Sequence, residues 1–236
     1  MTMLRGMLLR WALLLASAAL MVLACGAAGG DEQPSALRLA AAATVGVLAP
    51  LYWPGNAASP ARTLWRVALW SLGAAAGAAL LARLLGRLPQ PPSALLAIAA
   101  MLLLMSLPVH AAVAALEGRC TRPAAGSAVA ALLVLAGLLP LVAGPLAESL
   151  TGEFSGAIDA VIAASPLTHL ALAGGNDLLR NEWFYRRSNL APLQFSYPEL
   201  AGVVAAWALA GVALTALALS VLRRATSHPV TKEYRT

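Results

Sequence analysis

The chain has 236 residues, of which 60% are hydrophobic and only 11% are charged, and its formal net charge is +6. Soluble domains carry about 25% charged residues, and a soluble domain of this size keeps much of its surface in water. This composition excludes an ordinary soluble domain and predicts a protein that lies in a lipid bilayer. Its fifteen arginines and one lysine form no basic cluster outside the C-terminal tail. That distribution fits the positive-inside bias of membrane proteins and argues against a nucleic-acid partner.

Six segments are mostly apolar over roughly the 20 residues that a helix needs to cross a bilayer. We therefore predict an all-α, polytopic membrane helical bundle that forms a single transmembrane domain over residues 1–236. A long outer segment, 147–199, precedes the last span, and residues 223–236 form a cytoplasmic tail. The predicted spans lie at about 11–28, 36–53, 67–85, 93–116, 126–146 and 200–222.

The first span has two interpretations. Its basic start, its apolar run and the small residues before Cys25 in "VLAC" have the form of a secretory or lipoprotein signal that is cleaved. The interpretation that we favour is a retained first helix, and in both cases Cys25 faces outward. Cys25 and Cys120 are too few for a disulfide framework and lack the spacing of a metal site.

Arginine and lysine near the span ends predict the orientation of the bundle. With the N-terminus in the cytoplasm, the cytoplasmic segments hold ten basic residues and the outer segments hold six. We therefore expect an integral protein of the cell (inner) membrane with both termini in the cytoplasm.

Tryptophans flank the second connection, and their amphipathic rings favour the headgroup level of a bilayer. We therefore expect Trp53, Trp65 and Trp70 to form an interfacial belt. Gly73 and Gly77 have the G-x-x-x-G spacing that lets two helices approach closely, although this spacing arises easily by chance in a chain so rich in alanine.

Ionisable residues are nearly absent from the spans, which argues against a proton or cation path. His110 lies in the fourth span, where we expect it to be satisfied or interfacial, and His169 lies in the outer segment. Two histidines on facing helices can ligate a haem. A haem protein, or a membrane enzyme using Asp159, Asp177 and Glu182, is therefore an alternative.

Sequence motifs of catalysis are missing from the chain. It contains no G-x-x-x-x-G-K-[ST] phosphate loop, no H-E-x-x-H and no G-x-S-x-G. We accordingly predict no enzymatic activity, no cofactor and no metal site.

The outer segment holds the most informative pattern. Apolar residues recur at helical spacing over 154–164, which predicts an amphipathic helix too short to span and suited to an interfacial or re-entrant position. Ser165-Pro166 breaks this helix, and a second short turn follows and ends at Gly174-Gly175. The stretch "WFYRR" then places three rings beside two guanidinium groups, as is typical of a headgroup boundary.

Six spans, cytoplasmic ends, a broken amphipathic helix before the last span and the phrase "ASPLTHL" resemble the permease subunit of type-2 ABC exporters. The resemblance implies a separate cytoplasmic ATPase subunit and a second membrane subunit. It also implies docking of the ATPase on the connection 54–66, with Arg62 and Arg66 as the coupling residues. One feature departs from the family, because only about ten residues precede the first span here. The outer-segment candidates are Ser165, Thr168, His169, Trp183, Tyr185 and Arg186.

A second class of function fits the same residues. Small residues and few intramembrane polar groups suit a non-catalytic scaffold subunit of a larger membrane complex, such as a respiratory or photosynthetic assembly. The outer segment would then be a docking surface for partner subunits.

Overall fold

The protein folds as an all-α bundle in a computed structural model that describes residues 2–29, 34–57, 59–85, 91–147, 155–179 and 196–227. No strand occurs within these ranges, and the all-α prediction is confirmed. The elements are α1 (Thr2–Gly29), α2 (Pro34–Leu48), the 3-10 helix η1 (Ala49–Tyr52), α3 (Pro60–Leu85), α4 (Pro92–Leu116), α5 (Arg122–Ala147), α6 (Ser155–Ala164), α7 (Pro166–Ala173) and α9 (Leu200–Ser227).

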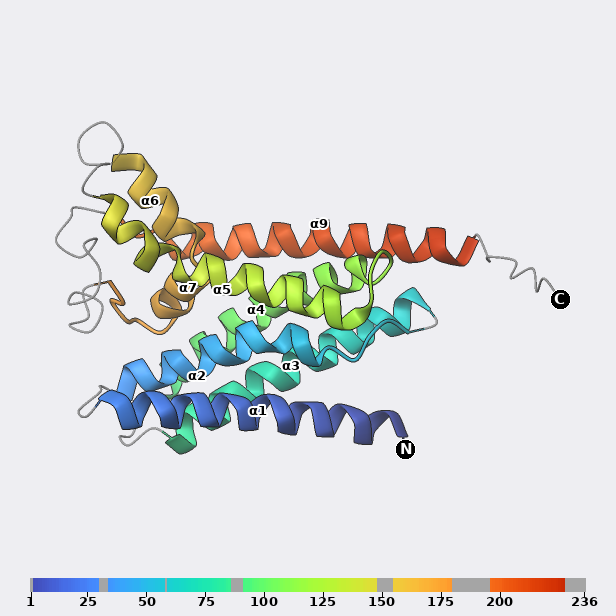
Figure 1. Ribbon diagram of the computed structural model, residues 1–236, viewed down its shortest axis with the longest axis horizontal. Helices are drawn as coiled ribbons and strands as arrows, with labels where there is room; N and C mark the ends of the chain where they lie inside the picture. The colour runs from blue at the N-terminus through green and yellow to red at the C-terminus, as the bar shows by residue number, and fades with distance from the viewer. Residues whose placement is uncertain are drawn as a thin grey trace.

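The long helices run side by side along one axis, and the start of α1 and the end of α9 lie at the same end of the bundle (Figure 1). Within the described ranges, five helices are long and apolar enough to cross a membrane: α1, α3, α4, α5 and α9. The bent pair α6–α7 would make a sixth crossing if it is counted as one span. These helices indicate a protein embedded in a membrane.

The second predicted span, 36–53, is not one continuous spanning helix. The α-helix ends at Leu48, η1 follows, and the apolar part Leu39–Tyr52 is shorter than 18 residues. Pro50 has no backbone N–H, so it cannot donate the next hydrogen bond of the α-helix. Its carbonyl accepts a hydrogen bond from Trp53 N at 3.4 Å. Together α2 and η1 rise about 30 Å.

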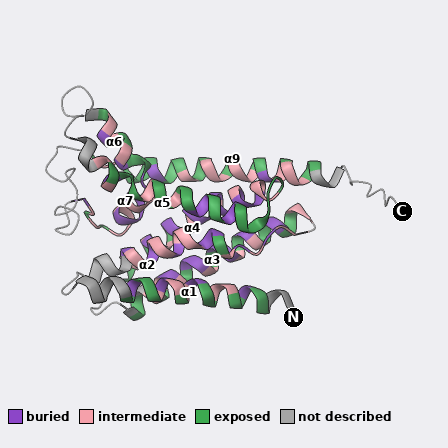
Figure 2. Ribbon diagram, in the orientation of Figure 1, coloured by how far each residue is buried: buried purple, intermediate pink, exposed green. Residues whose placement is uncertain are grey.

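Helix α4 is the centre of the bundle, with neighbours α3, α5, α7 and α9 packed around it. Its residues Met101, Leu102, Met105 and Val113 are buried in the main apolar core. By contrast, α5 and α9 present wide exposed apolar faces (Figure 2). Because water would penalise such faces, their natural surroundings are lipid or other apolar protein surfaces.

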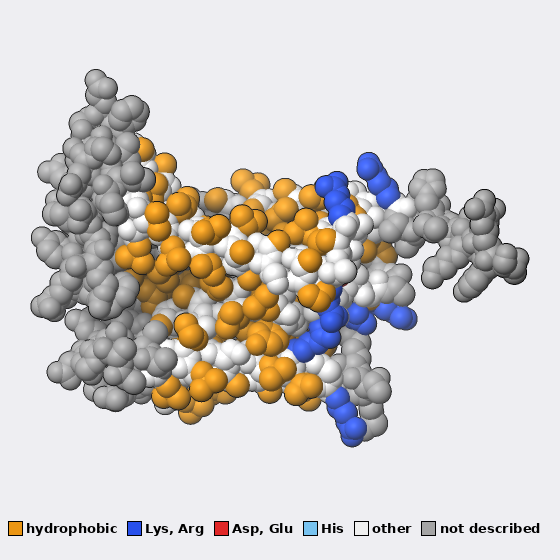
Figure 3. Space-filling view, in the orientation of Figure 1, with side chains coloured by type: hydrophobic (Ala, Val, Ile, Leu, Met, Phe, Trp, Pro, Cys, Tyr) orange, Lys and Arg blue, Asp and Glu red, His pale blue; other side chains and the backbone are white. Residues whose placement is uncertain are grey.

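Most of the described arginines lie at one end of the bundle, whereas Arg83 lies toward the other end, in the last turn of α3. Lys and Arg side chains gather at the end where α1 begins and α9 ends (Figure 3). The elements at this end carry Arg5, Arg10, Arg62, Arg66, Arg119, Arg122, Arg223 and Arg224. This arrangement agrees with the sequence-based pairing of loops on one side of a bilayer.

The G-x-x-x-G spacing in α3 serves packing within the chain. A Cβ on Gly73 would lie 2.3 Å from the Trp11 ring, and a Cβ on Gly77 would lie 2.8 Å from Leu15. Only glycine therefore lets α1 approach α3 so closely. Trp11 in turn stacks on Trp70, with ring centroids 5.9 Å apart.

We predict opposite effects for two glycine-to-alanine changes. Gly73→Ala should lower the thermal unfolding temperature in detergent, because overpacking costs roughly 1–3 kcal/mol. Gly202→Ala, on an exposed part of α9 with open space around its Cβ, should leave this temperature unchanged or raise it, since alanine favours helix over glycine by about 0.5–1 kcal/mol. Equal behaviour of the two variants would contradict the α1–α3 packing.

Candidate functional site

The broken helix pair α6–α7 lies at the end of the bundle opposite the start of α1 (Figure 1). The two helices bend by 77° at Ser165, as the Ser165-Pro166 step predicts. The predicted amphipathic helix is confirmed in α6, whose Ile158 and Ile162 are buried beside Leu179. The second short helix, α7, packs against α2, α4, α5 and α9. The pair is therefore a sharply bent element packed into one end of the bundle, and we call it the re-entrant pair after the position that the sequence predicts for it.

His169 of α7 is held in place by two hydrogen bonds to other helices. Trp207 Nε1 of α9 lies 2.9 Å from His169 Nδ1, and His169 Nε2 lies 2.8 Å from the carbonyl of Ala163. An indole N–H only donates and a carbonyl only accepts, so Nδ1 is the acceptor and Nε2 carries the proton. The ring is therefore a neutral imidazole that ties α9 to the C-terminal end of α6. With both nitrogens engaged, it has no lone pair for a haem iron.

Two other predicted residues are buried beside this histidine. Ser165 is fully buried, and its hydroxyl lies 3.4 Å from the carbonyl of Gly137 in α5. Thr168 is also fully buried, and its Oγ1 has no hydrogen-bond partner among the described residues. Ser165, Thr168 and His169 thus lie together, whereas Trp183, Tyr185 and Arg186 lie outside the described residues.

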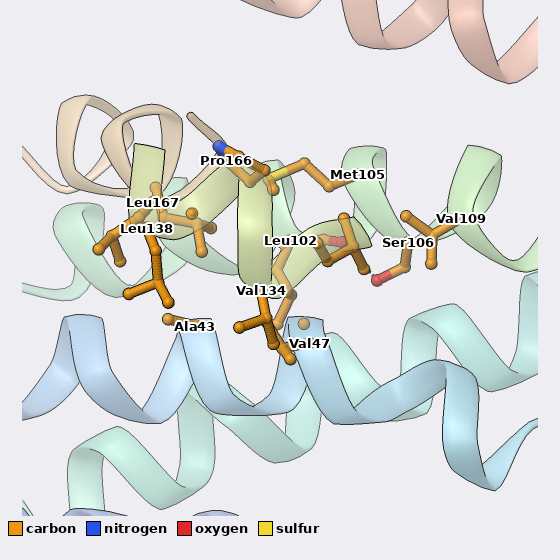
Figure 4. A pocket seen from close by; sticks show the side chains of 14 residues that line it. Ala43, Val47, Leu102, Met105, Ser106, Val109, Val134, Leu138, Pro166 and Leu167 are labelled. Atoms are coloured by element: carbon orange, nitrogen blue, oxygen red, sulfur yellow. Dashed lines mark hydrogen bonds between the residues drawn. The ribbon is translucent and has the colours of Figure 1, made fainter. Parts of the chain in front are cut away.

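An apolar cavity of about 190 Å³ lies beneath α7. Side chains of α2, α4, α5 and α7 converge on it (Figure 4). Its one side-chain hydroxyl belongs to Ser106, which donates to the carbonyl of Leu102 at 2.6 Å. Pro166, Leu167 and Leu170 supply the wall from α7. Helix α7 therefore forms one wall of an apolar cavity that is partly open at the surface of α5.

Polar bonds fasten the start of α9 to the re-entrant pair. Ser196 N donates to Asp159 Oδ1 of α6 at 2.8 Å. The hydroxyl of Tyr197 donates to the carboxylate of Asp177 and accepts from the backbone N–H of Leu179. Asp159 and Asp177, two of the three carboxylates that the sequence suggested for an enzyme, therefore serve as acceptors for the segment that precedes α9. The third, Glu182, lies outside the described residues.

At the opposite end, three arginines hold the loop 53–57 by its backbone carbonyls. The arginines come from α1, α3 and α5, so the loop joins three helices. The bonds run from Arg10 Nη1 to Trp53 O (2.7 Å), from Arg122 Nη1 to Pro54 O (3.2 Å), and from Arg66 Nη1 to Gly55 O and Asn56 O (3.4 and 3.3 Å).

The same loop is also bonded to α4. Asn56 N donates to Glu117 Oε2 at 3.0 Å, and Asn56 Nδ2 donates to the carbonyl of Ala114 at 3.2 Å. Gly55 has φ +87°, in the left-handed region where a side chain is strained. Burial raises the pKa of Glu117, opposed by the Asn56 N–H and by the charges of Arg122 and Arg10.

Two arginines were predicted to couple the chain to an ATPase subunit. Arg66 is hydrogen-bonded to the loop 53–57, and the Arg62 side chain is not. The Arg62 side chain is exposed on the first turn of α3. Sequence reasoning missed Glu117, although it is the one acid in the connection between two spans that also carries Arg119 and Arg122.

The expected tryptophan belt is wrong for two of its three members. Trp65 is 63% exposed, but Trp53 and Trp70 are buried and enclose His110, which is also buried. His110 stacks on Trp53 with ring centroids 4.9 Å apart and lies edge-on to Trp70 at 6.1 Å. Neither His110 nitrogen has a hydrogen-bond partner in the described part of the chain, so the expected satisfied or interfacial histidine is wrong too.

This burial has a physical cause. The α-helix α2 ends at Leu48 and η1 follows over Ala49–Tyr52, packed against α1 and α4, so that Trp53 stacks on His110 inside the bundle. Among the residues that the structure describes, no group of three or more His, Cys, Asp or Glu side chains could hold a metal ion.

Comparisons with protein-family models, with curated proteins and with solved structures find no match to this chain.

We predict that His169 and Trp207 are energetically coupled. Trp207→Phe should lower stability in detergent, because a buried nitrogen left without its partner costs roughly 1–3 kcal/mol. The double variant His169→Phe/Trp207→Phe should lose less than the sum of the two single variants. Trp65→Phe, at an exposed position, is the matched control. Additive single effects would contradict the coupling.

Glu117 should make stability depend on pH. A carboxyl whose pKa is higher in the folded than in the unfolded protein favours folding while it is protonated. That contribution is complete below the ordinary value of 4.5 and is lost as pH rises through the raised pKa. Glu117→Gln keeps an acceptor for Asn56 and cannot ionise, so its unfolding temperature relative to wild type should increase over this pH range. Glu199→Gln, at an exposed position, is the control, and parallel pH curves for wild type and Glu117→Gln would contradict the assignment.

Proposed function

We propose that this chain is the permease subunit of an ATP-driven exporter and works with a separate ATPase subunit and a second membrane subunit. The observation that carries the proposal is the re-entrant pair α6–α7, which interrupts the bundle before its last helix and covers an internal apolar cavity. Lipid-exposed backbone cannot bend in this way, so such breaks are found where they are buried in protein or line a cavity.

The two ends of the bundle are joined mechanically by α2. Its residues Ala43, Gly46 and Val47 line the cavity under α7, and the same helix continues through η1 into the loop 53–57. Arginines from α1, α3 and α5 are hydrogen-bonded to this loop. A displacement of the loop would therefore act on all three helices. Loop movement would shift the α2 wall of the cavity.

In this proposal the arginine-rich end faces the cytoplasm and receives the ATPase subunit. Membrane proteins carry more arginine and lysine in their cytoplasmic loops than in their outer loops, which favours the arginine-rich end as the cytoplasmic end. The exposed Arg62 side chain, next to the loop, suits an acidic surface on the ATPase. The re-entrant pair would then lie on the exit side of the transport route, with the cavity beneath it near the middle of the bundle.

We predict that coupling depends on Arg62. The tagged chain, purified from its native membrane in mild detergent, should carry a P-loop ATPase in a stoichiometric ratio and show vanadate-sensitive ATP hydrolysis. Arg62→Ala should lower the amount of bound ATPase subunit or its stimulated activity up to about fivefold, because an exposed ion pair is worth roughly 0.2–1 kcal/mol. Arg119→Ala, also exposed and at the same end of the bundle, is the matched control.

Other outcomes of this purification would overturn the proposal. A preparation that is free of any P-loop subunit and unable to hydrolyse ATP would do so. Stoichiometric electron-transfer subunits in its place would favour the scaffold function, for which the exposed apolar faces of α5 and α9 would be the subunit contacts.

A further inference from the structure

The cavity beneath α7 has the size and chemistry of a site for a small apolar group. Its volume is about 190 Å³, and an apolar protein cavity of about 150 Å³ stays dry and binds benzene or xenon. Its lining is aliphatic apart from Ser106, whose hydroxyl proton is already given to the Leu102 carbonyl. A polar or charged ligand would find no partner there and would lose its hydration.

The depth of the cavity narrows the choice of occupant. Met105 and Val134 line it and lie near the middle of α4 and α5, the helices Pro92–Leu116 and Arg122–Ala147. In a spanning bundle this is the level where the ends of lipid alkyl chains meet. Headgroups lie roughly 15 Å away, at the edges of a hydrocarbon core about 30 Å thick.

The wall formed by α5 belongs both to the cavity and to the exposed surface. Val134 and Leu138 line the cavity and are each 41% exposed. The residues of α4 behave differently, because Leu102 and Met105 line the cavity and are only 0% and 5% exposed. An occupant therefore has access along α5 and reaches α4 only if it enters the bundle.

We propose that this cavity binds the end of one alkyl chain of a bilayer phospholipid, which enters past α5 and lies against α4 under the re-entrant helix α7. The chain fills an aliphatic space that water does not, and it needs no polar contact. Its headgroup stays outside the bundle. Binding of the alkyl chain requires no ATPase subunit, so the test of this site is independent of the exporter proposal.

Photolabelling tests the site directly. The protein is placed in nanodiscs that contain a phosphatidylcholine with a diazirine near the end of one acyl chain, and labelled positions are mapped by mass spectrometry. Leu102 or Met105 should carry label, although both are buried from the outer surface. Leu209, which is 70% exposed on α9, reports ordinary contact with surrounding lipid.

Gly137 offers a way to fill the cavity. It lines the cavity, and a Cβ placed on it would meet no atom within 4 Å. Gly137→Leu should lower labelling of Leu102 and Met105 about tenfold, which corresponds to roughly 1.4 kcal/mol, and leave labelling of Leu209 unchanged. Gly202→Leu, with equally open surroundings on α9, should change neither. Val134→Phe narrows the cavity from α5 and serves as a second variant if Gly137→Leu does not fold.

Three results would overturn the proposal. The first is label on Leu209 without label on Leu102 or Met105 in the wild-type protein. The second is undiminished labelling of these α4 residues in both cavity-filling variants. The third is labelling of them by a diazirine fatty acid but not by the phospholipid, which would assign the site to a free fatty acid.

Discussion

The bundle is governed by the need to satisfy backbone polar groups where no water can do so. A bend between two short helices frees several N–H and C=O groups, and each unpaired group in hydrocarbon costs several kcal/mol. The pair α6–α7 meets this constraint locally. Ser165 N bonds to Ile162 O, His169 N bonds to Ser165 O, and Gly174, Gly175 and Asn176 donate back into α7. Packing against four other helices then shields the bend from lipid.

That shielding explains how polar side chains are distributed at the re-entrant end. His169 Nε2–H donates to the carbonyl of Ala163 at the end of α6, and His169 Nδ1 accepts from Trp207 of α9. Ser165 is directed to α5. Each of these side chains joins α6–α7 to a neighbouring element, so the polar groups act as fastenings of the re-entrant pair and leave the cavity beneath it apolar.

The opposite end is organised by charge and by backbone carbonyls. The loop 53–57 is not helical, and guanidinium groups from three helices donate hydrogen bonds to its backbone carbonyls. Glu117 adds a contact from α4. Helix α2 lines the cavity and continues through η1 into this loop, so it connects the two ends of the molecule.

The sequence by itself determined the all-α class, the positions of the long apolar helices, the break at Ser165-Pro166 and the concentration of arginine at one end. These follow from local rules: hydropathy over about 20 residues, proline chemistry and charge near helix ends. Helix α2 was the exception, because Pro50 ends its ladder before the apolar run is finished.

Only the tertiary structure decided which residues face one another. Helices that are apolar on all sides carry no periodic signal for a buried face, so the burial of Trp53 and Trp70 and the contact of Gly73 with Trp11 were not readable from the chain. The bond between His169 and Trp207 joins residues 38 positions apart, and the cavity exists because α2, α4, α5 and α7 leave a space between them. Such features depend on packing between distant segments, which no local pattern specifies.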